Sequence, residues 1–202
     1  MSVAQWQRVD SKTLEILLAA IGVVVLVVGM AMPLLGIVGI IDPVITSRAV
    51  PLGGGGDGAD ILRQGSFALT EGSTGELSFA DPSFKERVML ALPRLVSAGL
   101  ALAVVYLLLR VVRTLKAGDP FVPANARRVT AISALVIAFG TLDPIVESLT
   151  TGSLIGNSGA QYLIDTGVTF TWPPILIGIL VAALSEVFRR GTRLRADVEG
   201  LV

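Results

Sequence analysis

The chain has 202 residues, of which 52% are hydrophobic and only 16% are charged, against about 25% charged residues in soluble domains. Its mean hydropathy of +0.76 predicts a membrane protein, and its net charge of zero gives no support to direct nucleic-acid binding. It contains no Cys and no His, which excludes thiolate catalysis and Cys-based metal sites and removes the commonest general base, so we expect no enzyme, no cofactor and no metal site.

Four apolar segments are each long enough to cross a bilayer, which takes about 20 helical residues. They are predicted at about 15–41, 88–115, 129–149 and 166–188. The first is too long for the core of a signal peptide, so we expect it to be retained as a helix. The expected fold class is an all-α membrane protein, a single four-helix domain over residues 1–202.

The segment 42–87, between the first two spans, is predicted to form a small β-containing unit. "PVITSRAV" is rich in β-branched residues and indicates a strand, and "SFALT" and "ELSF" flank a Gly-containing turn that is typical of a hairpin. "GGGGDG" is expected to be a flexible tether, because a phosphate loop needs a preceding strand and a following helix N-terminus. Asp81-Pro82 predicts the start of the second helix.

Prolines and small residues add local detail to the helices. Pro33 and Pro93 each remove a backbone donor and are expected to kink the first and second helices. The pair beginning at Pro173 predicts that the fourth helix starts there, after a short irregular stretch. Gly99 and Gly178 each have a small residue four positions on, a pattern that allows helices to approach closely.

Three ionisable residues are predicted at membrane depth, where charges are costly and are candidates for function. Asp143 and Glu147 share one helix face if the third helix continues through Pro144. With Arg94 at a similar depth, one hypothesis is an intramembrane site that binds a cation or relays protons. The favoured alternative is a helix that ends before Pro144, with both carboxylates at the outer interface and Arg94 extending toward it.

Basic residues predict the topology, because cytoplasmic flanks carry the excess of Lys and Arg. Of the 16 basic residues, two precede the first span, five lie around the connector between the second and third spans, and four follow the last span. The connector between the third and fourth spans has none. We therefore expect a multi-pass protein of the cell membrane with both termini in the cytoplasm and segment 42–87 outside.

The connector "LKAGDPFVPANARRVTAI" and the ending "FRRGTRLRADVEGLV" resemble a family of bacterial membrane proteins known as domain of unknown function 2975, with an actinobacterial type of ending. The motif positions are Gly118, Pro120, Phe121, Asn125, Arg127 and Arg128, then Phe188, Gly191, Leu194, Asp197, Glu199 and Leu201. The resemblance covers about 88–202. It implies a bacterial inner membrane and a cytoplasmic transcription regulator of the helix-turn-helix type as partner.

These motif positions form a candidate cytoplasmic docking surface. Phe121 either packs under its own helix bundle, which we favour, or reaches a partner, and the arginines either contact a protein or neutralise anionic lipid headgroups. The preferred function is a non-enzymatic membrane-embedded regulator or sensor, whose outer loop senses and whose connector and tail hold the partner. The alternatives are a small transporter and an accessory or structural subunit of a membrane complex.

Overall fold

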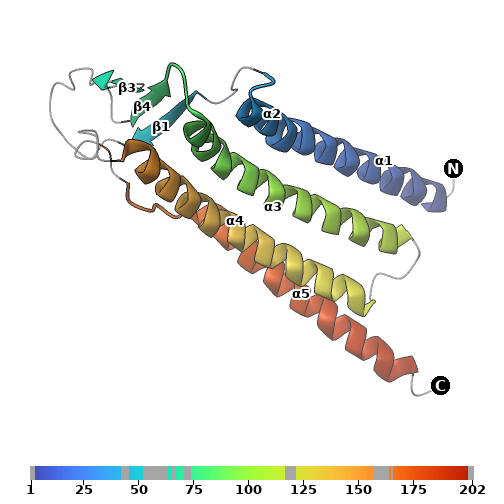
Figure 1. The fold of residues 1–202 in the computed structure, drawn as a ribbon. Coiled ribbons are helices and arrows are strands. Elements are labelled where there is room, and N and C mark those ends of the chain that lie inside the picture. The colour runs from blue at the N-terminus through green and yellow to red at the C-terminus, as the bar shows by residue number, and fades with distance from the viewer. Residues whose placement is uncertain are drawn as a thin grey trace. The chain divides into compact units, whose positions relative to one another are not determined.

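Helices make up most of the computed structural model, which describes residues 3–41, 46–51, 63–64, 67–70, 74–116, 122–156, 164 and 166–199. They are α1 (Val3–Val24), the π-helical η1 (Val25–Ala31), α2 (Met32–Val38), α3 (Phe84–Lys116), α4 (Pro123–Ile155) and α5 (Trp172–Glu199) (Figure 1). The strands are β1 (Ser47–Pro51), β2 (Arg63–Gln64), β3 (Phe67–Thr70) and β4 (Thr74–Phe79).

Four helical segments of the described chain are long and apolar enough to cross a membrane, which confirms the number of spans that the sequence predicts. They are Lys12–Val38, Phe84–Leu115, Pro123–Ile155 and Trp172–Arg193. Many large apolar side chains on these helices are exposed, among them Ile16, Leu176 and Leu180. An apolar surface of this extent is not stable in water, so it is the surface of a multi-pass membrane protein.

The chain divides into two compact units, each assembled from separated stretches of sequence. Unit 1 comprises Met1–Val27, Ala98–Thr141 and Thr171–Val202, and unit 2 comprises Val28–Ser97 and Leu142–Phe170. α3 and α4 are continuous helices that contribute residues to both units. The whole sheet belongs to unit 2.

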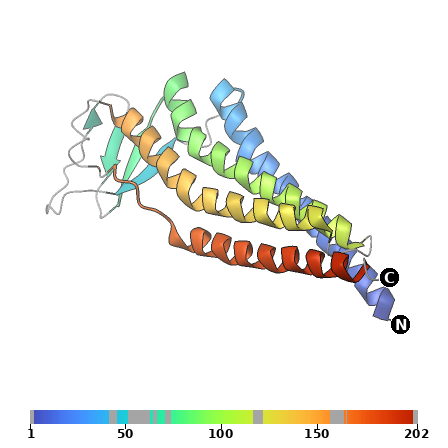
Figure 2. The ribbon, with the colours of Figure 1, turned by 90° about the horizontal axis from the view of Figure 1, so that it is seen from below.

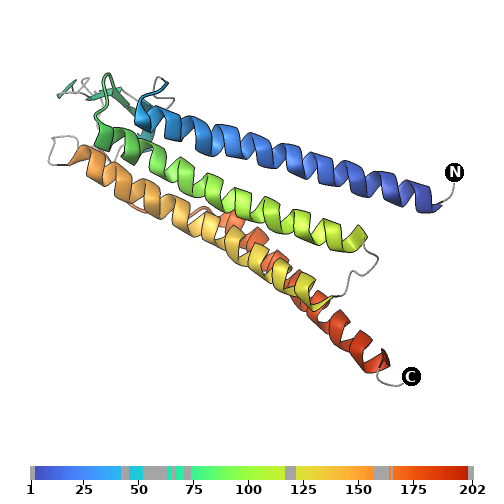
Figure 3. The same ribbon diagram turned by 45° about the vertical axis from the view of Figure 1, so that its right-hand side comes forward.

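In unit 1, α4 and α5 lie side by side because glycines remove side chains where the two helices meet (Figures 2 and 3). A Cβ added at Gly178 would overlap Cγ1 of Ile137 and lie 3.1 Å from the carbonyl oxygen of Ser133. A Cβ at Gly140 would lie 2.8 Å from a side-chain carbon of α5. The small-residue prediction is therefore confirmed at Gly178, whereas Gly99 faces open space.

α1 contacts α3 in the same unit, as the two neighbouring coils in Figure 3 show. A Cβ at Gly22 would lie 3.3 Å from Cγ1 of Val105. Nε of Arg113 donates to Oε1 of Glu15 at 2.9 Å. A close steric contact and an ion pair thus hold the first span against the second.

Three prolines lie beyond the first turn of a membrane-spanning segment. Pro33 is the second residue of α2, which follows the π-helical η1. α3 continues through Pro93 and α4 continues through Pro144. The expectation that the third helix ends before Pro144 is wrong, because a membrane helix tolerates one missing donor when neighbouring groups satisfy the freed carbonyl.

Two helix starts test the boundary signals in the sequence. α3 begins at Phe84 rather than at the predicted Asp81-Pro82, because Ser83 and Glu86 form a capping box. The backbone N–H of Ser83 donates to Oε2 of Glu86 at 2.7 Å, and that of Glu86 donates to Oγ of Ser83 at 3.4 Å. α5 begins at Trp172, next to the predicted Pro173, and residues 166–170 have no regular structure.

The strands form one antiparallel sheet in the order β1-β4-β3-β2. The predicted hairpin is confirmed by the pairing of β3 with β4, which places Phe67 opposite Phe79. β1 pairs with the other edge of β4. Burial alternates along β4, with Leu77 and Phe79 buried and Glu76 exposed, so one face of the sheet is a packing face.

The core of unit 2 lies where this packing face meets α3 and α4 (Figure 2). Its buried side chains are Val50, Leu77, Phe79, Leu90, Ile155 and Ile164. Each apolar side chain that is fully buried stabilises the fold by about 1.5–3 kcal/mol. This cluster fixes the sheet on the two helices and thereby sets the geometry of the polar groups beside it.

We expect Gly178→Ala to destabilise unit 1 by about 1–3 kcal/mol, because the new Cβ must displace Ile137 and meets the backbone of α4. Gly99→Ala is the matched control, since the same change in open space should be neutral or stabilise α3 by up to about 1 kcal/mol. Unfolding of the purified protein in mixed detergent micelles, followed by circular dichroism, measures both. Equal effects of the two substitutions would contradict the close contact of α4 with α5.

Candidate functional site

Arg48 on β1 makes more side-chain hydrogen bonds than any other residue in the described chain. Its Nη2 donates to the carbonyl oxygens of Met89 at 3.0 Å and Leu90 at 3.1 Å, both in α3. Its Nη1 donates to the hydroxyl oxygens of Thr150 at 2.7 Å and Thr151 at 2.9 Å, both in α4. One guanidinium therefore joins the sheet to two helices of unit 2.

Pro93 explains why a helix carbonyl is available to this arginine. In an α-helix the carbonyl of residue i accepts the N–H of residue i+4, and Pro93 has no N–H to offer Met89. Nη2 of Arg48 takes the vacant position. A buried carbonyl without a partner costs about 1–3 kcal/mol. Arg48 on β1 thus supplies the hydrogen-bond donor that Pro93 in α3 lacks.

The geometry of β1 presents Arg48 to the helices. Arg48 and Val50 are two residues apart and share one face of the strand, and Val50 is only 1% exposed in the core. Burial lowers the pKa of the Arg48 guanidinium, and the nearby charge of Glu147 opposes this effect. An arginine remains a cation at physiological pH even so. A permanent positive charge therefore lies at the junction of the sheet with α3 and α4.

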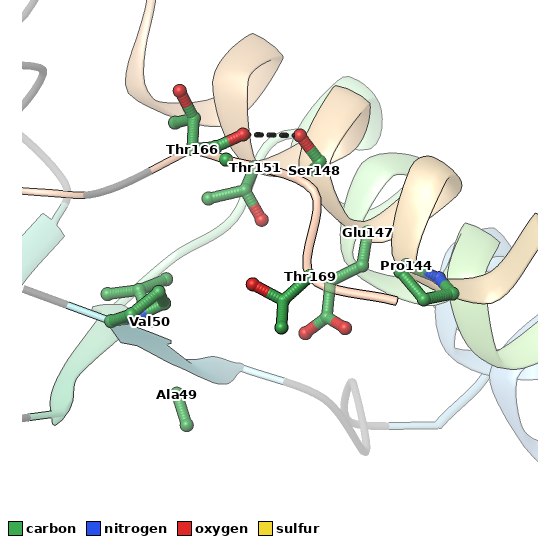
Figure 4. A pocket seen from close by; sticks show the side chains of 10 residues that line it. Ala49, Val50, Pro144, Glu147, Ser148, Thr151, Thr166 and Thr169 are labelled. Atoms are coloured by element: carbon green, nitrogen blue, oxygen red, sulfur yellow. Dashed lines mark hydrogen bonds between the residues drawn. The ribbon is translucent and has the colours of Figure 1, made fainter. Parts of the chain in front are cut away.

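A pocket of about 180 Å³ lies beside this junction, between β1, α4 and the segment that precedes α5 (Figure 4). Oγ of Ser148 donates to the carbonyl oxygen of Thr166 at 2.6 Å and holds that segment against α4. The side chains of Glu147 and Thr169 project into the pocket (Figure 4). Within the described chain, the Glu147 carboxylate has no hydrogen bond and no ion pair.

Asp143 and Glu147 lie on one continuous helix, α4, and among the described residues neither forms an ion pair with Arg94. Asp143 is half-buried and accepts a hydrogen bond from Oγ of Ser97, which links α4 to α3 in unit 2. Glu147 lies one turn further along α4, and its charge acts on the Arg48 guanidinium. Arg94 is exposed and forms no ion pair with any described residue.

Arg48 is not among the residues that the sequence singles out, although two signals point to it. Strand alternation places Arg48 on the same face as Val50, so its side chain is expected on the packing side of β1. Pro93 within a long apolar helix indicates that the carbonyl of Met89 needs a hydrogen-bond donor from outside that helix. Neither signal alone identifies the donor, because the two residues lie far apart in the chain.

The predicted docking residues next to connector 117–121 anchor its ends in unit 1. Asn125 is fully buried, and Nη1 of Arg128 donates to its Oδ1 at 2.9 Å. The same nitrogen donates to Oγ1 of Thr114 at 2.6 Å, which ties the second turn of α4 to the last turn of α3. Arg127, by contrast, is exposed. Of these three residues, Arg127 is the most exposed.

The remaining docking candidates are partly outside the described residues. Gly118, Pro120, Phe121 and Leu201 lie outside, and of Leu194, Asp197 and Glu199 the structure describes the backbone alone. That backbone is helical, so they share α5 with Phe188 and Gly191. In the preceding turn Glu186 pairs with Arg189 and with Arg190. Docking at these positions stays a prediction.

Arg48→Met should destabilise unit 2 by about 2–3 kcal/mol, because it leaves the Met89 carbonyl and two threonine hydroxyls without their charged donor. Arg94→Met is the matched control and should change the stability little, since Arg94 is exposed. Thermal unfolding in detergent and protease resistance of the sheet measure the difference. Equal destabilisation by both changes would contradict the role given to Arg48.

A double-mutant cycle isolates the dependence of Arg48 on Pro93. Pro93→Ala returns an N–H to the Met89 carbonyl, so the loss of Arg48 should cost about 1 kcal/mol less in that background. Additive effects would mean that the proline and the arginine act independently.

Comparison with known proteins identifies the family of this chain. No curated protein and no solved structure matches the chain. The model of a family described as "Protein of unknown function (DUF2975)" matches residues 77–202, more than half of the chain. The matched part contains α3, α4 and α5, with Pro93 and Glu147, and leaves out β1 with Arg48. The chain therefore belongs to the DUF2975 family.

Proposed function

We propose that this protein is a non-enzymatic sensor or regulator embedded in the membrane. Unit 2 receives a stimulus outside the cell, α3 and α4 carry the change, and connector 117–121 with the C-terminal tail holds a cytoplasmic protein partner. The observation that supports this most directly is the attachment of the sheet to both α3 and α4 through the single side chain of Arg48.

The two helices suit the transmission of a mechanical change. Each is an uninterrupted helix of 33 residues, about 50 Å long at 1.5 Å per residue. The same two helices flank connector 117–121, and Arg128 links them there. A stimulus that alters the bonds of Arg48 would change the position of α3 relative to α4, a small shift of packed helices of the kind that many switches use.

The partner side of the proposal rests on the family resemblance and on charge. The family resemblance implies a helix-turn-helix regulator as the partner. Arg127 provides an exposed cation near the start of α4. The distribution of Lys and Arg supports a cytoplasmic position of the connector. The alternatives are a small transporter and an accessory or structural subunit of a membrane complex. The transporter has less support because, among the described residues, Arg94 forms no ion pair with Asp143 or Glu147.

The proposed topology predicts the labelling of single cysteines at the two ends of α4. The chain has no native Cys, so Ala124→Cys and Ser153→Cys, both at exposed positions, each create one thiol. A membrane-impermeant maleimide should label Ser153→Cys in intact cells and should label Ala124→Cys only after the cells are opened. The reverse pattern would place the connector outside and would overturn the proposed direction of signalling.

Transmission predicts that a change at Arg48 alters the spacing of the helices at the connector. Nitroxide labels at Leu115→Cys in α3 and Ala124→Cys in α4, both exposed, report their separation by double electron–electron resonance in nanodiscs. We expect Arg48→Met to shift or broaden this distance distribution and Arg94→Met to leave it unchanged. Identical distributions for a folded Arg48→Met protein would sink the proposal.

A further inference from the structure

The pocket beside Arg48 has an exposed carboxylate on its wall, that of Glu147. The Glu147 carboxylate lines the pocket without a hydrogen bond or an ion pair among the described residues. Arg48 is the neighbouring cation, but both its terminal nitrogens donate to oxygens of α3 and α4. A carboxylate at a concave site with its nearest cation already engaged is complementary to a positively charged ligand.

The rest of the lining narrows the class of cation. The hydroxyl oxygen of Thr169 provides a further acceptor, and Val50 and Pro144 provide an apolar wall (Figure 4). A primary ammonium group has three donors and no acceptor, which suits one carboxylate and a neighbouring hydroxyl. Among the described residues no group of three acidic side chains could hold a metal ion, whereas Ca²⁺ and Mg²⁺ take six or more oxygen ligands.

The size of the pocket limits the ligand further. Its volume of about 180 Å³ is below the range of about 300–1,000 Å³ that holds drug-sized ligands. A short alkyl chain fits such a space, with its carbons against the apolar wall. The site is therefore matched to a small molecule that carries one ammonium group and few carbon atoms.

We propose that the pocket binds a small primary ammonium ion with a short apolar tail, its ammonium group on the Glu147 carboxylate and the Thr169 hydroxyl. The inference deepens the proposed function, on which it rests, by giving the chemical class of the stimulus. A cation at Glu147 cancels the negative charge beside the Arg48 guanidinium and repels that guanidinium. The ligand would thus act on the same bonds that hold β1 to α3 and α4.

The test titrates n-propylammonium into the full-length protein in nanodiscs of zwitterionic lipid at pH 7, with empty nanodiscs as the blank. Saturation-transfer NMR reports the binding. We expect saturable binding with a dissociation constant in the millimolar range, and binding about fivefold weaker for the neutral n-propanol and the anionic propionate. Preference for n-propanol or propionate, or the absence of saturable binding, would overturn the proposal.

Variants locate the site. Glu147→Gln should weaken n-propylammonium binding about fivefold, the value of one lost ion pair, and Glu76→Gln, an exposed carboxylate of the same unit, should leave it unchanged. Thr169→Leu replaces a lining hydroxyl with a larger apolar side chain that fills the pocket, and it should abolish binding. Unchanged affinity in either Glu147→Gln or Thr169→Leu refutes the site, and Thr169→Leu decides alone if circular dichroism shows that Glu147→Gln is misfolded.

The distance between the labels at Leu115 and Ala124 separates this inference from the proposed function. Binding that requires Glu147 but leaves that distance unchanged supports the ammonium site and overturns the relay. A distance that responds to Arg48→Met, in a protein that does not bind n-propylammonium, supports the relay and overturns the ammonium site.

Discussion

The hydrogen bond from Arg48 to the carbonyl of Met89 is the constraint on which the arrangement of unit 2 depends. A membrane helix must satisfy all its backbone groups, and Pro93 leaves one of them without its donor. The donor arrives from a strand, so β1 must lie against α3 in the register that also places Val50 in the core. The pocket, with Glu147 on its wall, is a consequence of that placement.

Polar contacts and small residues take the place of the hydrophobic effect in holding these helices together, because lipid tails are as apolar as leucine. In unit 2 the contacts are those of Arg48 and the hydrogen bond from Ser97 to Asp143. In unit 1 they are the hydrogen bonds of Arg128 to Thr114 and Asn125 and the close approach of α4 and α5 at Gly178. Each unit is thus stabilised by its own specific contacts, to which unit 2 adds the apolar cluster between the sheet and the two helices.

Features set by local chemistry can be predicted from the sequence, and those set by distant partners cannot. Bilayer thickness sets the length of the four spans. Alternating strand residues predict the β3–β4 hairpin, and a proline pair predicts the start of α5. The continuation of α4 through Pro144 depends on tertiary surroundings, as does the pairing of Arg48 with Thr150, 102 residues away. The sequence therefore predicts only part of the candidate site. Glu147 is identified as a charged residue in an apolar segment, whereas Arg48 is not identified.

The gap at Met89 also bears on how this chain could have evolved. The family match begins at residue 77, after β1, so the strand that supplies the donor lies outside the shared region while the proline lies within it. A lineage that lost the strand and kept the proline would carry an unpaired carbonyl in its second helix, at a cost of about 1–3 kcal/mol. In this chain Arg48 and Pro93 therefore form one structural unit, because the strand residue supplies the donor that the helix residue lacks.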